Sequence, residues 1–348
     1  MKHPTILFCL LFNIISHTAL ADNNRRPKDS TNIYQKIDTN FIESYRDILT
    51  AKLIAVVRNN RFSITDKLSQ QSIEYGINTN LNMGIGLNFK GIGLELQYNP
   101  PGLNNDDHKF GKSTQFSVAS SANTRRFIID AFYRYNQGFH TTKPFLHSND
   151  TIADYYRRGD IKNNNIGVNM MYIFNNKRFS SSAPYSLTQR QKKGAGSLLL
   201  GTYFFLYSID ADSIIYPDTL YKSFKPAVQF SNAASTTFGI SCGYSYTFVF
   251  FKHWFANITT VPGISIQEFY SKNAFTQEVY KRVAPSFSFQ YKLSVGFNRK
   301  SYFIGISYQE NQFVISDDKA SSVNYKYGTF KFYYGHRFDL RKLLKKVV

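Results

Sequence analysis

The 348-residue chain contains 32 Phe and 25 Tyr but one Trp, and its formal net charge is +19. Of its two cysteines, Cys9 lies in an N-terminal apolar run that we expect to be removed and leaves Cys242 alone, which excludes a secreted scaffold held by intrachain disulfides. No Pro-, Gly- or Ser-rich linker divides the sequence, which favours one large domain, and an exported chain of this charge is expected to meet anionic lipid phosphates rather than nucleic acid.

Residues 1–21 have the form of a signal peptide. A short positive start, Lys2-His3, precedes a mostly apolar run at 5–15, and Ala-Leu-Ala at 19–21 has the small-x-small pattern of a cleavage site. The apolar run is too short to span a bilayer. The sequence therefore predicts export, with cleavage after Ala21.

Residues 22–50 are predicted to form a periplasmic N-terminal segment. Residues 22–40 are polar and charged, a composition typical of disordered segments. The stretch 41–51 (FIESYRDILTA) leads into a long strand at about 52–66. A helix over 52–66 is an open alternative, although the apolar residues there do not follow a helical period.

Residues 80–98 are predicted to form a β-hairpin. Apolar residues alternate strictly with polar residues or glycine in both arms, and Lys90-Gly91 lies between the arms. The apolar positions are Leu81, Met83, Ile85, Leu87, Phe89, Ile92, Leu94, Leu96 and Tyr98. An isolated hairpin is marginal in water, so this face needs a large partner, which we predict to be lipid.

The same alternation returns along the rest of the chain. It is weaker at 112–122 and clear at 126–135, 166–174, 238–250, 286–297, 302–308 and about 325–338. The connections are short at 90–91, 123–124, 251–253 and 299–300, and long at 67–79, 99–111, 140–162, 209–235, 268–284 and 315–324.

This pattern of connections predicts an all-β fold, a single antiparallel transmembrane β-barrel over residues 51–338. Outer-membrane barrels have short periplasmic turns and long external loops, whereas a soluble sandwich also alternates but needs no such asymmetry. Counting 52–66 as one strand gives about twelve strands, an even number that leaves both ends in the periplasm. Closure of the barrel satisfies every backbone group within the lipid.

Aromatic residues gather at the ends of the strands that carry short turns. This arrangement is typical of the aromatic girdle at a membrane interface. The residues assigned to the girdle are Phe89, Phe127, Phe174, Phe250, Phe251, Trp254, Phe255, Phe297, Tyr302 and Phe338.

Three segments carry a family resemblance: 41–50 (FIESYRDILT), 78–98 (NTNLNMGIGLNFKGIGLELQY) and, most specifically, 176–201 (NKRFSSSAPYSLTQRQKKGAGSLLLG). With them, most of the chain after the signal resembles an uncharacterised Bacteroidetes family known as a domain of unknown function. Members of that family look like outer-membrane barrels. The resemblance implies fold and location, and it implies no catalytic residue.

Four charged residues are predicted to point into the lumen, because each alternates with outward apolar neighbours. They are Glu95, Asp130, Arg134 and Lys292. Charges inside a barrel must be paired or hydrated, since burying one alone is costly. They form either a polar path that selects a solute by charge or a network that fills a closed core.

The segment 175–196 is too long for a periplasmic turn. It carries five basic residues, together with Phe, Pro and Tyr, and is predicted to plug the lumen or to contact a periplasmic partner; a solvated basic loop is the alternative. The basic residues are Lys177, Arg178, Arg190, Lys192 and Lys193.

No catalytic, metal or cofactor site is expected. The sequence G-x-S-x-G around Ser241 falls within unbroken alternation rather than at a strand-to-helix turn, so we interpret it as an inward serine. His108, His140 and His147 are assigned to external loops beside Asp106, Asp107 and Asp150, without metal-ligand spacing, and His253 and His336 complete the histidines after the signal.

The tail 339–348 has Leu340, Leu343, Leu344 and Val347 at helical spacing between basic residues, so it is predicted to lie on the inner leaflet as a short helix or to fray. The expected partners are outer-membrane lipids and the barrel assembly machinery. The leading functional hypothesis is a narrow solute channel or a structural membrane protein. There are two alternatives. One is a membrane-embedded enzyme that acts on lipid or polysaccharide, and the other is a surface binding protein that uses loops 140–162 and 209–235.

Overall fold

The structure is a computed structural model, and it describes residues 37–78, 81–100, 106–144, 154–216, 229–317 and 321–338. The chain divides into two compact units, Met1–Ile37 and Asp38–Val348, and all the described strands belong to the second. The predicted signal peptide and cleavage site, the tail 339–348, His147 and Asp150 lie outside the described residues.

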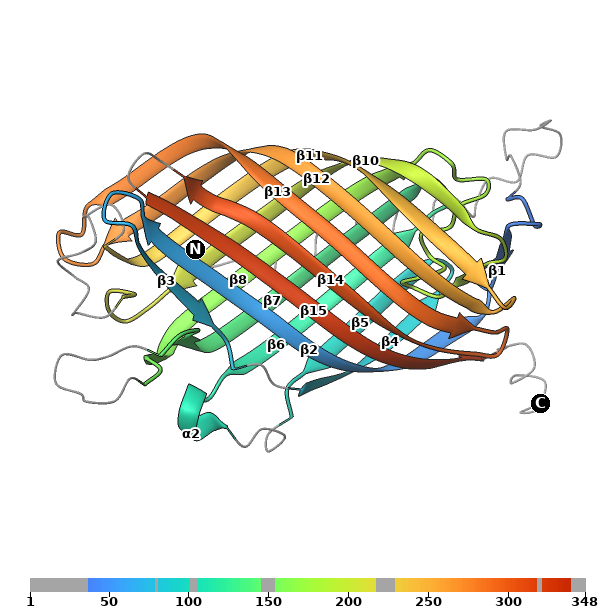
Figure 1. Cartoon of the computed structure of the whole chain (residues 1–348), viewed down its shortest axis with the longest axis horizontal. Helices are drawn as coiled ribbons and strands as arrows, with labels where there is room; N and C mark the ends of the chain where they lie inside the picture. Colours follow the sequence, from blue (N-terminus) through green and yellow to red (C-terminus); the bar gives the residue numbers. More distant parts are fainter. Residues whose placement is uncertain are drawn as a thin grey trace. The chain divides into compact units, whose positions relative to one another are not determined.

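Twelve antiparallel strands of the second unit form one closed ring (Figure 1). β15 (Ser321–Phe338) pairs with β2 (Leu49–Asp66) from end to end, and this pairing closes the ring. The predicted twelve-stranded all-β barrel is therefore confirmed, and residues 52–66 form a strand rather than a helix. Between β2 and β15 the ring runs through β4 (Leu81–Phe89), β5 (Ile92–Tyr98), β6 (Thr114–Asn123), β7 (Phe127–Thr141), β8 (Arg157–Ile173), β10 (Ala195–Asp210), β11 (Phe230–Phe250), β12 (Trp254–Asn273), β13 (Val279–Asn298) and β14 (Tyr302–Asp317).

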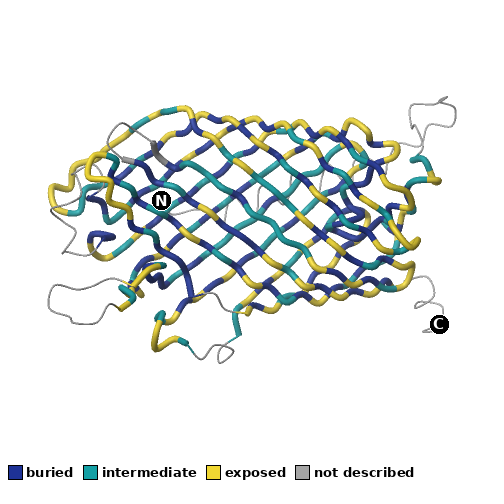
Figure 2. Tube along the Cα trace, viewed as in Figure 1, coloured by how far each residue is buried: buried dark blue, intermediate teal, exposed yellow. Residues whose placement is uncertain are grey.

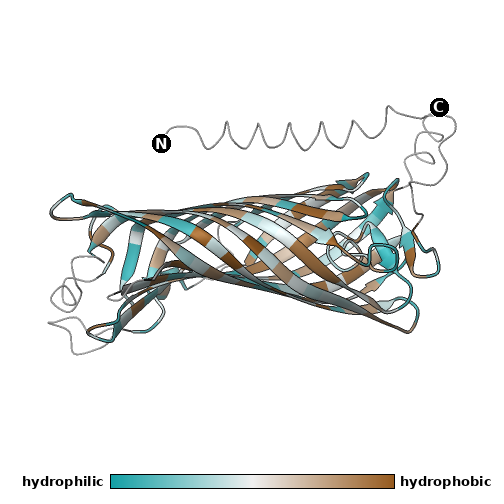
Figure 3. Ribbon diagram, turned by 90° about the horizontal axis from the view of Figure 1, so that it is seen from above, coloured by the Kyte–Doolittle hydropathy of each residue, from teal (hydrophilic) through white to brown (hydrophobic). Residues whose placement is uncertain are grey.

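Burial alternates along these strands (Figure 2), and hydropathy varies along them as well (Figure 3), as expected where successive side chains face opposite sides of the wall. In β4, for example, Met83 and Ile85 are each 54% exposed, while Asn82 of the same strand, on the opposite face, is buried. The predicted hairpin turns at Lys90-Gly91, whose φ angles of 51° and 86° suit the two-residue turns that join twisted strands. No helix in the described part of the chain is long and apolar enough to cross a membrane.

Short turns join the strands at one end of the barrel, here called the turn end; the opposite end is the loop end. Phe250, Trp254 and Phe338 lie exposed at the turn end, as predicted for the girdle. The prediction for Phe255 is wrong: it is 4% exposed and packs inward with Leu187. Because Phe255 follows Trp254 directly in a strand, only one of the two can face outward.

The wall is incomplete at the loop end beside β4, β5 and β6, because these strands have only 9, 7 and 10 residues. β3 (Gln71–Gly76), which lies within the predicted loop 67–79, fills the gap. It pairs with β2 and, through Tyr75 and Gly76, reaches β7. The short helix α2 (Asp107–Phe110) lies between β5 and β6.

Other predicted long loops are shorter than expected, because the strands continue past the apolar band. The clearest correction concerns the predicted loop 268–284: β12 runs to Asn273 and β13 starts at Val279. Glu268 and Lys281 there form an exposed ion pair of 3.2 Å across the two strands. Polar outward residues of this kind resemble a loop in sequence, although the backbone remains paired.

The loop-end half of the lumen is filled by a hydrophobic core. Aromatic rings stack within it, with ring centroids 4.3 Å apart for Phe205 of β10 and Phe313 of β14, and 5.1 Å apart for Phe62 of β2 and its partner Tyr75 of β3. The segment after β10 adds Ile214, Ile215 and Tyr216 to the same core. This half of the barrel is therefore packed with side chains rather than open.

Candidate functional site

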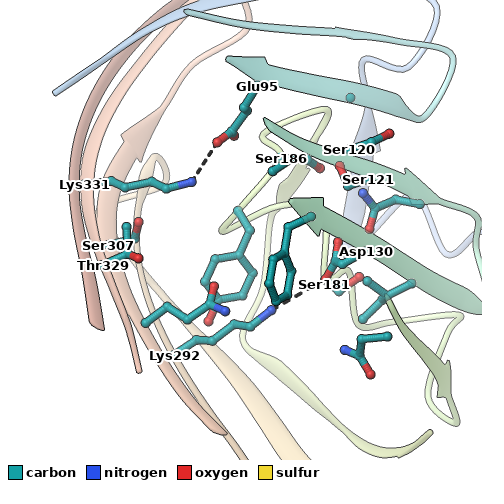
Figure 4. Close-up of a pocket in the computed structure, with 18 of the residues that line it drawn as sticks. Glu95, Ser120, Ser121, Asp130, Ser181, Ser186, Lys292, Ser307, Thr329 and Lys331 are labelled. Carbon is teal, nitrogen blue, oxygen red and sulfur yellow. Dashed lines mark hydrogen bonds and ion pairs between the residues drawn. The ribbon is translucent and has the colours of Figure 1, made fainter. Parts of the chain in front are cut away.

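A chamber of about 200 Å³ remains inside the barrel, between the loop-end core and the turn end (Figure 4). Phe132 and Tyr327 line it toward the core, and Ser181, Tyr185 and Ser186 line it toward the turn end. The predicted lumen residues Glu95, Asp130, Arg134 and Lys292 all line this one chamber, together with Lys52 and Lys331, which the sequence did not single out.

Glu95 of β5 is held by two lysines from neighbouring parts of the wall. Its Oε1 lies 2.5 Å from Nζ of Lys52, and its Oε2 lies 2.7 Å from Nζ of Lys331. The side-chain amide of Gln97 also donates to Oε2 at 3.1 Å. One carboxylate thus serves two ammonium groups, so this cluster keeps one positive charge in excess.

Asp130 of β7 and Lys292 of β13 face each other across the chamber (Figure 4), with 3.7 Å between Oδ2 and Nζ. Lys292 Nζ also lies 5.5 Å from the centre of the Tyr185 ring. At this distance the pair is looser than the contacts of Glu95, and the ammonium keeps donors that point into the chamber.

Arg134 of β7 lies between two aromatic rings. The guanidinium carbon is 4.0 Å from the centre of the Phe132 ring and 3.8 Å from that of Tyr327. Its Nη1 is buried and has no hydrogen-bond partner among the described residues. Such stacking fixes the orientation of the fork but does not neutralise its charge.

The turn end of the chamber is closed by residues 179–188, here called the plug. The phenol of Tyr185 donates to Oδ1 of Asn257 at 2.5 Å, and burial raises the pKa of that phenol, so it stays protonated. Leu187 packs against Phe255 and Phe303 of the wall. After the plug, β9 (Gln189–Gln191) pairs with β1 (Ile42–Ser44) and so ties the N-terminal segment to it.

The five basic residues predicted for this segment do not enter the chamber. Lys177, Arg178, Lys192 and Lys193 are exposed at the edges of the plug. Arg190 forms an ion pair of 2.8 Å with Glu43 and contacts Nδ1 of His253 at 2.7 Å. The plug itself is uncharged, because Phe, Ser, Ala, Pro, Tyr, Leu and Thr make up residues 179–188.

Hydrogen bonds fasten the segment that closes the loop end. Nη1 of Arg158 donates to the carbonyls of Ile214 and Ile215 at 2.6 and 3.0 Å, and Arg158 also pairs with Asp160 at 2.8 Å. The phenol of Tyr75 donates to the Ile215 carbonyl at 2.5 Å. Sequence reasoning misses this closure, because it assigns 209–235 to an external loop and no motif in 211–216 indicates that the segment folds inward.

The remaining sequence candidates are scattered. Ser241 lies in the middle of β11, and its buried hydroxyl has no partner among the described residues. His108 lies in α2, whereas His140 belongs to β7 rather than to a loop, and it stacks on Phe110 with ring centroids 4.7 Å apart. His336 lies on the exposed face of β15.

Several solved outer-membrane structures are similar to this chain in fold. The outer membrane protease OmpT from Escherichia coli is 7% identical to this chain and has a TM-score of 0.41. The match covers 85% of this chain and 98% of the protease chain. The β domain of the Bordetella autotransporter BrkA is 10% identical, with coverages of 84% and 98% and a TM-score of 0.36. The Pseudomonas putida toluene transporter TodX is 6% identical, with coverages of 84% and 90% and a TM-score of 0.26.

A comparison with curated protein sequences finds no match. A family model described as "Domain of unknown function (DUF4421)" matches residues 36–338, which include β1, the plug and the whole ring. The chain is a member of the DUF4421 family, and its fold is a closed antiparallel β-barrel of twelve described strands.

Proposed function

We propose that this protein is a non-conducting outer-membrane barrel in its resting state, a structural membrane protein that encloses a small chamber rather than an open solute channel. The turn end faces the periplasm, and the loop end faces outward. The observation that carries the proposal is that side chains fill both ends of the lumen, those of the plug 179–188 on one side and those of the loop-end core on the other.

The two closures differ in kind. The loop-end core is built mostly from rings on wall strands, such as Phe62, Phe205 and Tyr325, which cannot leave without unpacking the wall. Such packed interiors are rigid and resist gradual opening. The chamber is therefore sealed more firmly on the outer side than on the periplasmic side.

A gated narrow channel is the second candidate, favoured by the construction of the plug. The plug is one continuous uncharged segment, held to the wall by contacts such as Tyr185 to Asn257 and the Arg337 guanidinium to the Leu187 carbonyl. A segment of this kind can withdraw without breaking any pairing between strands of the ring.

Planar-bilayer recordings distinguish the two candidates. Wild type and a variant whose plug is replaced by a Gly-Ser linker are both expected to give no conductance steps. A third variant combines the linker with glycines at 214–216 and with Phe205→Ala and Tyr325→Ala, and it is expected to conduct. Steps from wild type would refute the closed lumen, and steps from the linker variant alone would favour the gated channel.

A further inference from the structure

The chamber carries more positive than negative charge. Lys52, Arg134, Lys292 and Lys331 line it, and the carboxylates that line it are Glu95 and Asp130. All these residues belong to the described part of the chain, which offers the chamber no further acidic group. An excess of buried cations is costly unless an anion compensates it.

A fifth cation lies just beyond the lining and increases the imbalance. Arg58 of β2 is 2% exposed and donates to Oε1 of Gln97 at 2.5 Å, which is a neutral acceptor. Arg58 and Arg134 repel each other electrostatically. Neither has an ion pair with a carboxylate among the described residues, although both are enclosed by the barrel.

Two of the cations that line the chamber, Arg134 of β7 and Lys292 of β13, carry donors that no close ion pair occupies. Arg134 presents a buried Nη1 without a partner, fixed in direction by the Phe132 and Tyr327 rings. Lys292 approaches from the opposite wall and is only loosely paired with Asp130. A planar guanidinium fork and an ammonium group in one chamber are donors of the kind that recognise oxyanions such as phosphate and carboxylate.

We propose that the chamber binds one small oxyanion, a phosphate or a small carboxylate, between Arg134 and Lys292. A volume of about 200 Å³ holds such an ion together with several waters, each of which takes roughly 30 Å³. The inference rests on the closed chamber of the proposed function for retention of the anion, but the binding itself requires only the cations.

The site is tested by refolding the barrel in labelled inorganic phosphate, so that the anion can enter before the chamber closes, and then dialysing it to equilibrium against the same solution. The expected result is about one phosphate per folded barrel, with affinity at least tenfold weaker in Arg134→Met and in Lys292→Met. Asp130→Asn is expected to bind more tightly, because it removes the carboxylate that competes for Lys292. A purely structural role of these residues would not produce opposite changes in affinity from neutralising opposite charges.

Lys281→Met is the matched control, because it removes a lysine whose side chain is 65% exposed on the outer wall. It should leave binding unchanged, and a heat-dependent gel shift verifies that each variant is folded. Labelled acetate is run in parallel and shows whether phosphate or carboxylate is preferred. If folded wild type binds neither anion, or if Lys281→Met weakens binding as much as Arg134→Met, the oxyanion site is refuted.

Rapid desalting of the loaded barrel separates the site from the closure. Retained phosphate is expected, because the plug and the core seal the chamber. Binding in dialysis followed by immediate loss on desalting would contradict the closed lumen and leave the oxyanion site intact.

Discussion

At the scale of single residues, glycines on the inward face make room for aromatic rings. A Cβ added to Gly167 of β8 would lie 2.3 Å from the Phe132 ring, and one added to Gly335 of β15 would collide with the Phe303 ring. The sequence shows glycine on this face but not the reason for it. The rings that fill the spaces come from neighbouring strands, and one of them, Phe132, also stacks on Arg134.

Gly167→Ala is expected to destabilise the barrel by about 1–3 kcal/mol, the usual effect of inserting a methyl group into a packed interior. Gly159→Ala in the same strand is the control, because nothing lies within 4 Å of its added Cβ. Urea unfolding in lipid vesicles, followed by the fluorescence of the single tryptophan, Trp254, measures both. Equal midpoints for the two variants would contradict the role assigned to the glycine.

Alternation predicts the inward charges only where the opposite face is clearly apolar. Glu95, Asp130 and Lys292 lie in such strands, and the sequence points to them directly. Lys331 lies in β15, where inward Tyr327 and Tyr333 are as aromatic as the outward residues, so periodicity gives no contrast. Its pairing with Glu95, 236 positions away in the sequence, depends on closure of the ring.

At the scale of elements, the plug depends on one arginine of the last strand. Arg337 is 5% exposed and donates to the carbonyls of Leu187 and Arg299 and, at 2.8 Å, to Oδ1 of Asn298. Its guanidinium carbon also lies 4.1 Å from the centre of the Tyr45 ring. Arg337 therefore joins the plug, the N-terminal segment and the turn between β13 and β14.

Arg337→Met is expected to loosen the plug, because each buried carbonyl left without a donor costs about 1–3 kcal/mol. Limited trypsin digestion of the folded barrel should then cut faster between Lys177 and Lys193, while the strands stay intact. His336→Gln, on the exposed face of the same strand, serves as the control. Unchanged cleavage in Arg337→Met would show that other contacts hold the plug.

The sequence predicts the elements of the ring well and those of the loop end poorly. Strands with one apolar and one polar face, such as β4 and β11, are evident from their alternation. Alternation does not identify the residues of the loop-end core, because Phe204 and Phe205 are both apolar although they face opposite sides of β10. The unusual length of 175–196 predicts a plug, but not which of its residues enter the lumen.

At the scale of the whole molecule, the outward apolar residues form a band that no described layer of protein covers. Leu53, Ile266 and Phe287 are 65%, 67% and 67% exposed, and they come from separate strands around the ring. Burial of such a surface in hydrocarbon is strongly favourable, whereas its exposure to water is not. At the loop end the strands extend beyond this band, and their outward face becomes polar there.

A pair of substitutions in β2 tests where this band ends. Leu53→Lys places a charge within the band and is expected to lower the free energy of unfolding in vesicles by about 2–4 kcal/mol. Ser63→Lys is also outward but lies beyond the band, in register with Glu74, and is expected to change it by less than about 1 kcal/mol. Urea titration in lipid vesicles measures both differences.

In detergent micelles, which adapt to a charged surface, the difference between the variants should shrink. Equal effects in vesicles would mean that lipid does not cover Leu53, and the membrane position of the whole barrel would then have to be redrawn.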